Sequence, residues 1–330
     1  MNHVPRLSVG LPVYNGAKYL ARSLDALLGQ TYTDFELIIS DNASTDGTAE
    51  ICHAYEKLDD RIRYFRQARN VGAAPNHDFV FRRAQGEFFK WTASDDLYAR
   101  ELFERCVKAL DEHPEVVLVH CWTAAIDSED TVIQALDYPL ATDSPDPAVR
   151  FRSMLFGNGD RDFGLIRADD QYGVMRVDML RKVPALGSYY HSDRTQMTEI
   201  ALQGPFYQVP EWLYFRRDHS DRPQHATPTV RGWCVNQDPR RADKLRYPAA
   251  RLVAEFIWGY VAAIGRAPLS GAERIKCYRI LAEWFASRAT PAVKRLVRGG
   301  MFSGQRVEIP PPPEWLTVEA LVAGQERNAR

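Results

Sequence analysis

The chain has 330 residues, of which 45% are hydrophobic and 26% are charged, a composition that is ordinary for a globular protein and excludes disorder. The net charge of −1 shows no bias toward nucleic acid, so we expect no nucleic-acid partner. The five cysteines form no CxxC pair and are odd in number. This argues against a disulfide framework and against a structural zinc site, and it fits a reducing cytoplasm.

No segment of the sequence predicts membrane insertion. The first residues lack a basic stretch followed by a long apolar run, so we expect no signal peptide. The most apolar late window, residues 252–264, contains Glu255 and is shorter than the roughly 20 residues needed to span a bilayer. We therefore expect a soluble, cytoplasmic protein. Basic residues outnumber acidic ones by about two to one from Arg240 onward, which indicates either solvated helix faces or a basic face for an anionic surface.

Short β-type runs alternate with helical patterns over the first 121 residues. The expected strands are residues 6–11, 35–40, 62–65, 87–91 and 116–121, and the expected helices are residues 18–30, 46–58, 74–84 and 98–113. Alternation of this kind predicts βαβ units and a mostly parallel sheet that is covered on both faces.

The pattern changes after about residue 127. Residues 141–148 indicate a loop, and residues 163–176 and 206–216 indicate strands on either side of a helix at 194–202. The last part is expected to be helical, over residues 252–264, 272–286 and 292–296.

Three polar clusters follow expected strands of the first half. They are residues 12–16 (PVYNG), 41–47 (DNASTDG) and 94–96 (SDD). Each cluster alone could be a turn or a helix cap. Ligands of open α/β sheets bind beyond the carboxyl ends of the strands, so the placement of all three at such ends favours a binding site.

These clusters and three further segments resemble the inverting nucleotide-sugar glycosyltransferases of family 2. The matching segments are LPVYNG (11–16), SDNASTDGT (40–48), ARNVGAAPN (68–76), SDD (94–96), HSD (191–193) and EIALQGPFYQVPEWLYFRRDH (199–219). The resemblance covers residues 5–220 and implies an α/β GT-A fold: a Rossmann-like, mostly parallel central sheet flanked by helices, here with a C-terminal helical extension. It implies a donor-binding half at residues 1–125, an acceptor-binding and catalytic half of the same domain at 126–235, and the extension at 236–330.

The resemblance also assigns donor-site residues. It implies that Asp41 accepts a hydrogen bond from the nucleotide base, that Asp95 contacts the ribose and that Asp96 binds a divalent ion, Mn²⁺ or Mg²⁺. The alternative for Ser94 and Asp95 is a cap of the following helix. The other residues expected to bind the nucleotide are Pro12, Val13, Tyr14, Asn15, Arg69, Asn70 and Ser94.

Residues near the reacting groups come from the later segments. The resemblance implies that Asp193 is the general base, with the alternative that it caps a helix in a capping box with Gln196. It implies that His219 ligates the metal ion, with the alternative of an ordinary loop histidine. Arg216 and Arg217 are expected to bind the diphosphate or to form surface salt bridges.

The reaction implied is transfer of a sugar from a nucleotide-diphosphate-sugar donor (UDP, GDP or dTDP) to an acceptor hydroxyl, with inversion. The acceptor would be a saccharide, a lipid-linked group or a small molecule, in polysaccharide, glycolipid or other glycoconjugate biosynthesis. One alternative is a sugar-nucleotide nucleotidyltransferase, which a first loop with one glycine and one lysine disfavours. Another is a non-catalytic carbohydrate- or partner-binding module. The C-terminal helices could form a homodimer or touch the inner face of a membrane.

Overall fold

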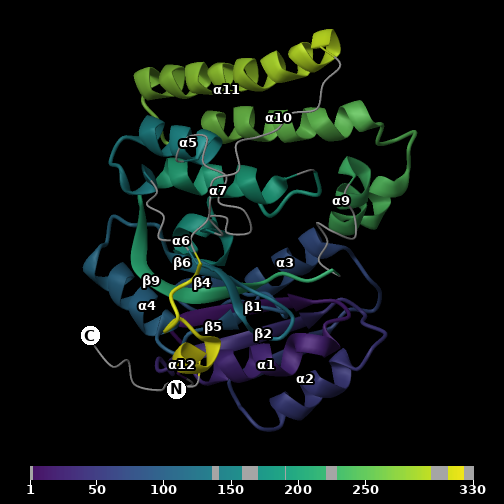
Figure 1. Cartoon of the computed structure of the whole chain (residues 1–330), viewed down its shortest axis with the longest axis vertical. Helices are drawn as coiled ribbons and strands as arrows, with labels where there is room; N and C mark the ends of the chain where they lie inside the picture. Colours follow the sequence, from purple (N-terminus) through teal and green to yellow (C-terminus); the bar gives the residue numbers. More distant parts are fainter. Residues whose placement is uncertain are drawn as a thin grey trace.

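A mixed β-sheet forms the centre of the protein (Figure 1). The computed structural model describes residues 3–135, 141–157, 170–189, 191–220, 229–298 and 311–322, with residues 288–298 described by their backbone alone. Within these residues nine strands form one sheet in the order β3-β2-β1-β4-β8-β6-β9-β5, and β7 pairs with β6. The strands are β1 (Leu7–Val13), β2 (Phe35–Asp41), β3 (Ile62–Arg66), β4 (Phe88–Trp91), β5 (Leu97–Tyr98), β6 (Leu118–Ile126), β7 (Val132–Ala135), β8 (Val174–Arg176) and β9 (Phe206–Arg217).

The first half of the sheet is parallel. Strand β1 pairs with β2 on one side and with β4 on the other, and β2 pairs with β3. The register places Val13 opposite Asp41 and Gly10 opposite Trp91. The loops that follow β1, β2 and β4 therefore leave the sheet at the same edge.

The second half returns the chain to that edge. Strands β6 and β9 run parallel along each other, while β8 is antiparallel to both β4 and β6. The short strand β5, directly after Asp96, pairs antiparallel with the end of β9, with Leu97 opposite Phe215. This pairing brings the Ser94–Asp96 segment to Arg217 although the two are more than 100 residues apart.

Helices cover both faces of the sheet and add a third layer (Figure 1). The helices that share a core with one face are α1 (Ala17–Leu28), α2 (Thr48–Glu56), α4 (Leu102–Glu112) and α12 (Val318–Val322). The helices on the other face are α3 (Ala73–Phe81), α6 (Val177–Leu180) and α7 (Ser192–Gln203). The outer layer on α7 consists of α5 (Pro147–Phe156), α10 (Ala249–Arg266) and α11 (Gly271–Arg298), and α9 (Val230–Gln237) lies beside it.

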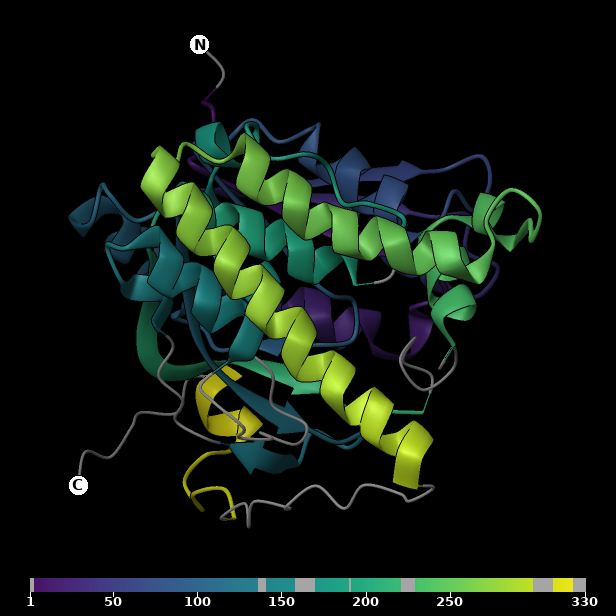
Figure 2. The ribbon, with the colours of Figure 1, turned by 90° about the horizontal axis from the view of Figure 1, so that it is seen from above.

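The outer layer is fixed to α7 by close backbone approach and by a buried charge. A Cβ on Gly259 would lie 2.8 Å from Tyr189 Oη, so the backbone of α10 passes close to the tyrosine that precedes α7. Arg266 of α10 donates two hydrogen bonds, at 2.8 and 2.7 Å, to the buried carboxylate of Glu199 on α7. The C-terminal helices are thus part of the packed structure (Figure 2).

Four sequence-based expectations need correction. The helix expected at residues 98–113 begins at Leu102, because residues 97–98 pair with β9 instead. The loop expected at 141–148 contains the start of α5, whose first turn is capped by Asp146 accepting from Ala148 N at 2.8 Å. The strand expected at 163–176 is observed only at Val174–Arg176, and residues 158–169 lie outside the described residues. Residues 272–286 and 292–296 belong to one continuous helix, α11.

Candidate functional site

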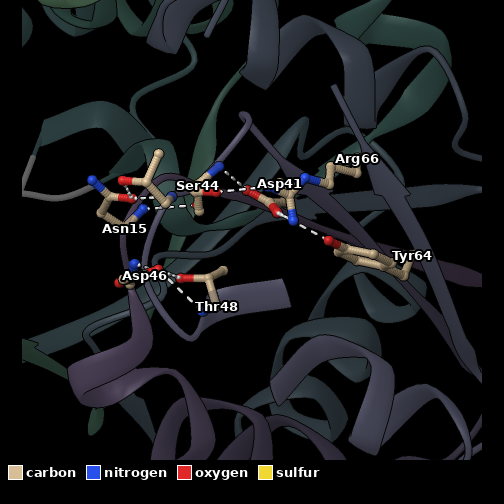
Figure 3. A network of polar contacts seen from close by, with 9 residues as sticks. Asn15, Asp41, Ser44, Asp46, Thr48, Tyr64 and Arg66 are labelled. Carbon is tan, nitrogen blue, oxygen red and sulfur yellow. Dashed lines mark hydrogen bonds and ion pairs between the residues drawn. The ribbon is translucent and has the colours of Figure 1, made fainter. Parts of the chain in front are cut away.

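The loops after β1 and β2 are hydrogen-bonded to each other (Figure 3). Asn15 N donates to Ser44 Oγ at 2.9 Å, and Asn15 Oδ1 accepts from Thr45 N at 2.9 Å. Asn15 has a φ of 51°, in the left-handed region that asparagine enters more readily than most residues. The carboxylate of Asp46 accepts from Ala17 N, at the start of α1. The sequence-predicted clusters 12–16 and 41–47 therefore form one rigid surface.

Asp41 shapes this surface from within. Its side chain is fully buried, and it accepts from Ser44 N at 2.8 Å and from the hydroxyl of Tyr64 at 2.9 Å. Arg66 lies 3.8 Å from the same carboxylate and donates to Ser44 O at 2.8 Å (Figure 3). These contacts hold the 42–46 loop, because a buried carboxylate is stable only with donors around it. Tyr64 and Arg66, which support this loop, were not identified by the sequence motifs, since neither lies in a polar loop.

The residues expected to wall the nucleotide differ in exposure. Val13 is buried and Pro12 is half-buried, whereas Tyr14 is 49% exposed. Tyr14 thus presents its ring at the sheet edge, where a base could stack on it. Ser94 lies on the same surface, since a Cβ on Gly16 would be 3.0 Å from Ser94 Oγ.

Arg69 and Asn70 lie on a loop that is tied to the 42–46 loop. Both are exposed, and Asn70 Oδ1 accepts from Asn42 Nδ2 at 3.0 Å. Gly72, with a φ of +94°, packs against the end of α9: a Cβ there would lie 2.3 Å from Gln237 O. Residues 237 and 238, at the end of α9, therefore contact the loop that follows β3 directly.

Asp96 is buried behind the surface. It is 0% exposed, one oxygen accepts from the hydroxyl of Tyr214, and the other accepts from Arg217 N at 2.8 Å. The cap alternative for Ser94 and Asp95 is wrong, because a strand follows and α4 begins only at Leu102.

Asp95 faces outward and meets His219. Its side chain is 23% exposed, and its Oδ2 lies 2.9 Å from His219 Nε2. The ring of His219 packs against that of Tyr19 on α1, with centroids 5.1 Å apart. The structure thus joins a carboxylate oxygen and an imidazole nitrogen at the sheet edge. Among the described residues no three His, Cys, Asp or Glu side chains gather around one point.

Arg217 packs behind the Asp95–His219 pair. It is fully buried, its Nε donates to Asp95 O at 2.7 Å, and its Nη1 donates to Asp127 O at 2.7 Å. Its Nη2 pairs with the carboxylate of Asp130, and the guanidinium lies 4.4 Å from the centre of the Tyr19 ring. The expected salt bridge of Arg217 is present, with Asp130, but it is buried and not on the surface. Burial of the guanidinium argues against its binding a diphosphate.

A buried lysine lies under Asp96. Lys90 of β4 is 1% exposed, donates to Tyr172 O, and lies 5.4 and 5.7 Å from the ring centres of Tyr98 and Tyr214. Desolvation lowers the pKa of Lys90 to about 8, and the negative charge of Asp96 opposes that effect. The only sequence signal for Lys90 was a charged residue inside an otherwise apolar strand.

Asp193 lies in the first turn of α7, partly exposed, on a different element from the other predicted residues. The capping alternative is wrong: the residue at the cap position is His191, with a φ of 51°, and Gln196 Nε2 donates to Pro184 O at 3.0 Å. The ring of His191 lies 5.6 Å from Trp233 on α9. Since α9 also contacts Gly72, one short helix touches both the donor-side loop and the entry to α7.

Polar loops gathered at the carboxyl ends of parallel strands, with an outward carboxylate beside a histidine, define an α/β protein built to hold a ligand at the sheet edge. The sequence profile described as Glycosyl transferase family 2 matches residues 8–180. An uncharacterized glycosyltransferase of Haemophilus influenzae is 30% identical over 233 residues, which cover 66% of this chain and 90% of that protein. The chain belongs to glycosyl transferase family 2.

Two further similarities concern parts of the chain or its fold. Glycosyltransferase GlyG of Streptococcus pneumoniae serotype 4 is 34% identical over 113 residues, which cover 34% of this chain but only 38% of GlyG. The crystal structure of S. aureus TarS 1-349 in complex with UDP-GlcNAc superposes with a TM-score of 0.61 at 18% identity, covering 85% of this chain and 71% of that one. The expected GT-A fold, with additional C-terminal helices, is confirmed.

No helix among the described residues combines the length and the apolar character that crossing a bilayer requires.

Proposed function

We propose that this chain transfers a sugar from a nucleoside diphosphate sugar to an acceptor hydroxyl, with inversion at the anomeric carbon and with a divalent metal ion. The observation that carries the proposal is the Asp95–His219 pair, 2.9 Å apart, at the edge where the loops after β1, β2 and β4 emerge. Residues 1–125 would bind the donor, residues 126–235 would bind the acceptor, and residues 236–330 would support both.

The nucleotide would lie on the joined loops after β1 and β2. Tyr14 and Asn15 are exposed there, and Val13 and Pro12 form the floor beneath them. Asp41 would act mainly by holding the 42–46 loop, since its oxygens already accept hydrogen bonds from Ser44 and Tyr64. Arg69 and Asn70, exposed on the adjoining loop, would lie along the nucleotide. TarS, which has a similar fold, binds UDP-GlcNAc in its structure, and a UDP-sugar is the first donor to test.

The metal would be held by Asp95 and His219, with phosphate oxygens as the remaining ligands. One carboxylate oxygen plus one imidazole nitrogen suits Mn²⁺ better than Mg²⁺, which prefers oxygen. When bound, such an ion neutralises negative charge on the departing diphosphate. This assignment moves the metal from Asp96, expected from the sequence, to Asp95, because Asp96 is fully buried with both oxygens accepting hydrogen bonds. Asp96 becomes a positioning residue that holds Tyr214 and Arg217 behind the pair.

Asp193 would act as the general base. The acceptor hydroxyl gives its proton to the Asp193 carboxylate, and its oxygen forms a bond to the anomeric carbon. The bond from that carbon to the phosphate oxygen breaks on the opposite side, and the nucleoside diphosphate leaves with the electron pair. The products are an inverted glycoside and a nucleoside diphosphate. The position of Asp193 in the first turn of α7 stabilises its ionised form, which is the form a base needs.

Thermal-shift measurements with UDP-, GDP- and dTDP-sugars, with and without Mn²⁺ or Mg²⁺, test the donor and the metal. Ligand at 100 times its dissociation constant stabilises the native state by about 2.7 kcal/mol. We expect one nucleotide to stabilise the protein only with metal present. Asp193→Asn should retain this stabilisation and lose transfer activity, while full activity in the folded variant would refute the base assignment. Retention of anomeric configuration in the product would refute direct displacement.

A further inference from the structure

The C-terminal helices carry a charge opposite to that of the remaining chain. Residues 240–298 contain thirteen Lys and Arg but only four Asp and Glu, a net charge of +9. Since the whole chain has a net charge of −1, the other residues together carry −10. A separation of this size creates a strong positive potential over one part of the molecule.

The four acidic residues of this segment are already included in its net charge of +9, and each has a partner among the described residues. Their contacts are Asp243 with Leu245 N and Arg246 N, Glu255 with Arg241 and Arg251, Glu273 with Ser270, and Glu283 with Arg152.

The same segment exposes large apolar side chains. Val253, Ile257 and Trp258 lie at helical spacing on one side of α10, and Trp258 is 67% exposed. On α11, Ile275 and Tyr278 are also exposed, and the hydroxyl of Tyr278 donates to Val261 O on α10 at 3.5 Å. We call these five residues, Val253, Ile257, Trp258, Ile275 and Tyr278, the hairpin surface. It belongs to the outermost layer of the described structure (Figure 2).

A loop leading into α10 repeats this combination. Leu245 is 96% exposed and lies between Lys244 and Arg246, which are exposed as well. The carboxylate of Asp243 accepts from Leu245 N at 2.9 Å and from Arg246 N at 3.1 Å, which fixes the turn. Leu245 thus presents an apolar side chain between two cations, shortly before the start of α10.

We propose that the α10–α11 hairpin and the 244–246 loop bind the surface of an anionic lipid bilayer. Helices that lie in the bilayer interface combine Trp and aliphatic side chains with Lys and Arg, and tryptophan in particular favours the headgroup level. Each cation near such a surface adds to the attraction. A second copy of the chain is a poorer partner, because a symmetric dimer through these helices would bring together two segments that each carry a net positive charge. A nucleic acid would contact the cations, but it would leave the apolar side chains of Val253, Ile257 and Trp258 without a partner.

The test is co-sedimentation of the full chain with vesicles, without donor or acceptor, so its outcome does not depend on the proposed activity. One set of vesicles is pure phosphatidylcholine and the other contains about one third phosphatidylglycerol. We expect the chain to bind only the anionic vesicles. Added salt should weaken this binding, because it shortens the Debye length. Trp258→Ser should weaken binding roughly tenfold, and so should Lys244→Glu combined with Arg246→Glu.

The matched control is Leu58→Ser, which removes an 80% exposed leucine from the donor half. It should bind vesicles like the unchanged protein, and circular dichroism should show all variants folded. Three results would overturn the proposal: no binding to anionic vesicles at low salt, equal binding to both lipid sets, or an equal loss in Leu58→Ser. A concentration-dependent dimer that Trp258→Ser dissolves, without vesicle binding, would assign the surface to a second copy instead.

Discussion

Separate substitutions of the adjacent Asp95 and Asp96 distinguish a metal ligand from a buried residue that stabilises the fold. Asp96→Ala leaves the hydroxyl of Tyr214 and the N–H of Arg217 without an acceptor in a fully buried environment. Each such group costs about 1–3 kcal/mol, and Lys90 loses the nearby negative charge that favours its cation. We expect the free energy of unfolding to fall by roughly 3–5 kcal/mol.

Asp95→Ala should behave in the opposite way. It removes a partly exposed carboxylate that contacts His219, so the free energy of unfolding should change by less than about 1 kcal/mol. The same substitution removes one of the two proposed metal ligands, so stabilisation by donor should lose its metal dependence.

Urea unfolding measures the free energy of unfolding of each variant. Thermal shift with nucleotide sugar, with and without Mn²⁺, measures the metal dependence of donor stabilisation. If Asp96→Ala folds too poorly, Asp96→Asn replaces it, because the amide keeps one acceptor oxygen. The reasoning would be refuted if an Asp96 variant were as stable as the unchanged protein and lost metal dependence while Asp95→Ala kept it. That result would identify Asp96 as the metal ligand.

Three further predictions concern the support of the site. In the unchanged protein the free energy of unfolding should rise between pH 8 and about 10.5, and Lys90→Met should remove that rise. Urea midpoints of the two proteins, measured across this pH range, test it. The sign follows because the pKa of Lys90 is about 8 when folded and 10.5 when unfolded, so the unfolded chain holds more protons in that window; identical pH profiles would contradict it. Gly72→Ala should destabilise the protein by roughly 2 kcal/mol and weaken donor binding, because a Cβ would meet Gln237 O at 2.3 Å; an unchanged thermal midpoint would contradict it. Arg266→Ala should cost roughly 2 kcal/mol in urea unfolding, since it leaves the carboxylate of Glu199 buried without its cation, and Arg266→Lys should recover part of that loss.

Local sequence patterns were sufficient for the parallel half of the sheet. The runs at β1, β2 and β4 are short and rich in apolar residues, and each ends in a polar turn, so their type and order could be predicted from residues close in sequence. The prediction failed where pairing with distant residues decides the structure. Residues 97–98 became a strand only because the end of β9 lies beside them.

The sequence by itself determined that three polar loops follow three neighbouring strands and that acidic residues occur among them. It could not determine which acidic residue faces a ligand, because Asp95 and Asp96 are adjacent and chemically equal. Only the tertiary structure decided this: β9 returns to the same edge and covers Asp96 with Tyr214 and Arg217, while it leaves Asp95 beside His219. Burial depends on contacts across more than 100 residues, and no local pattern records those contacts.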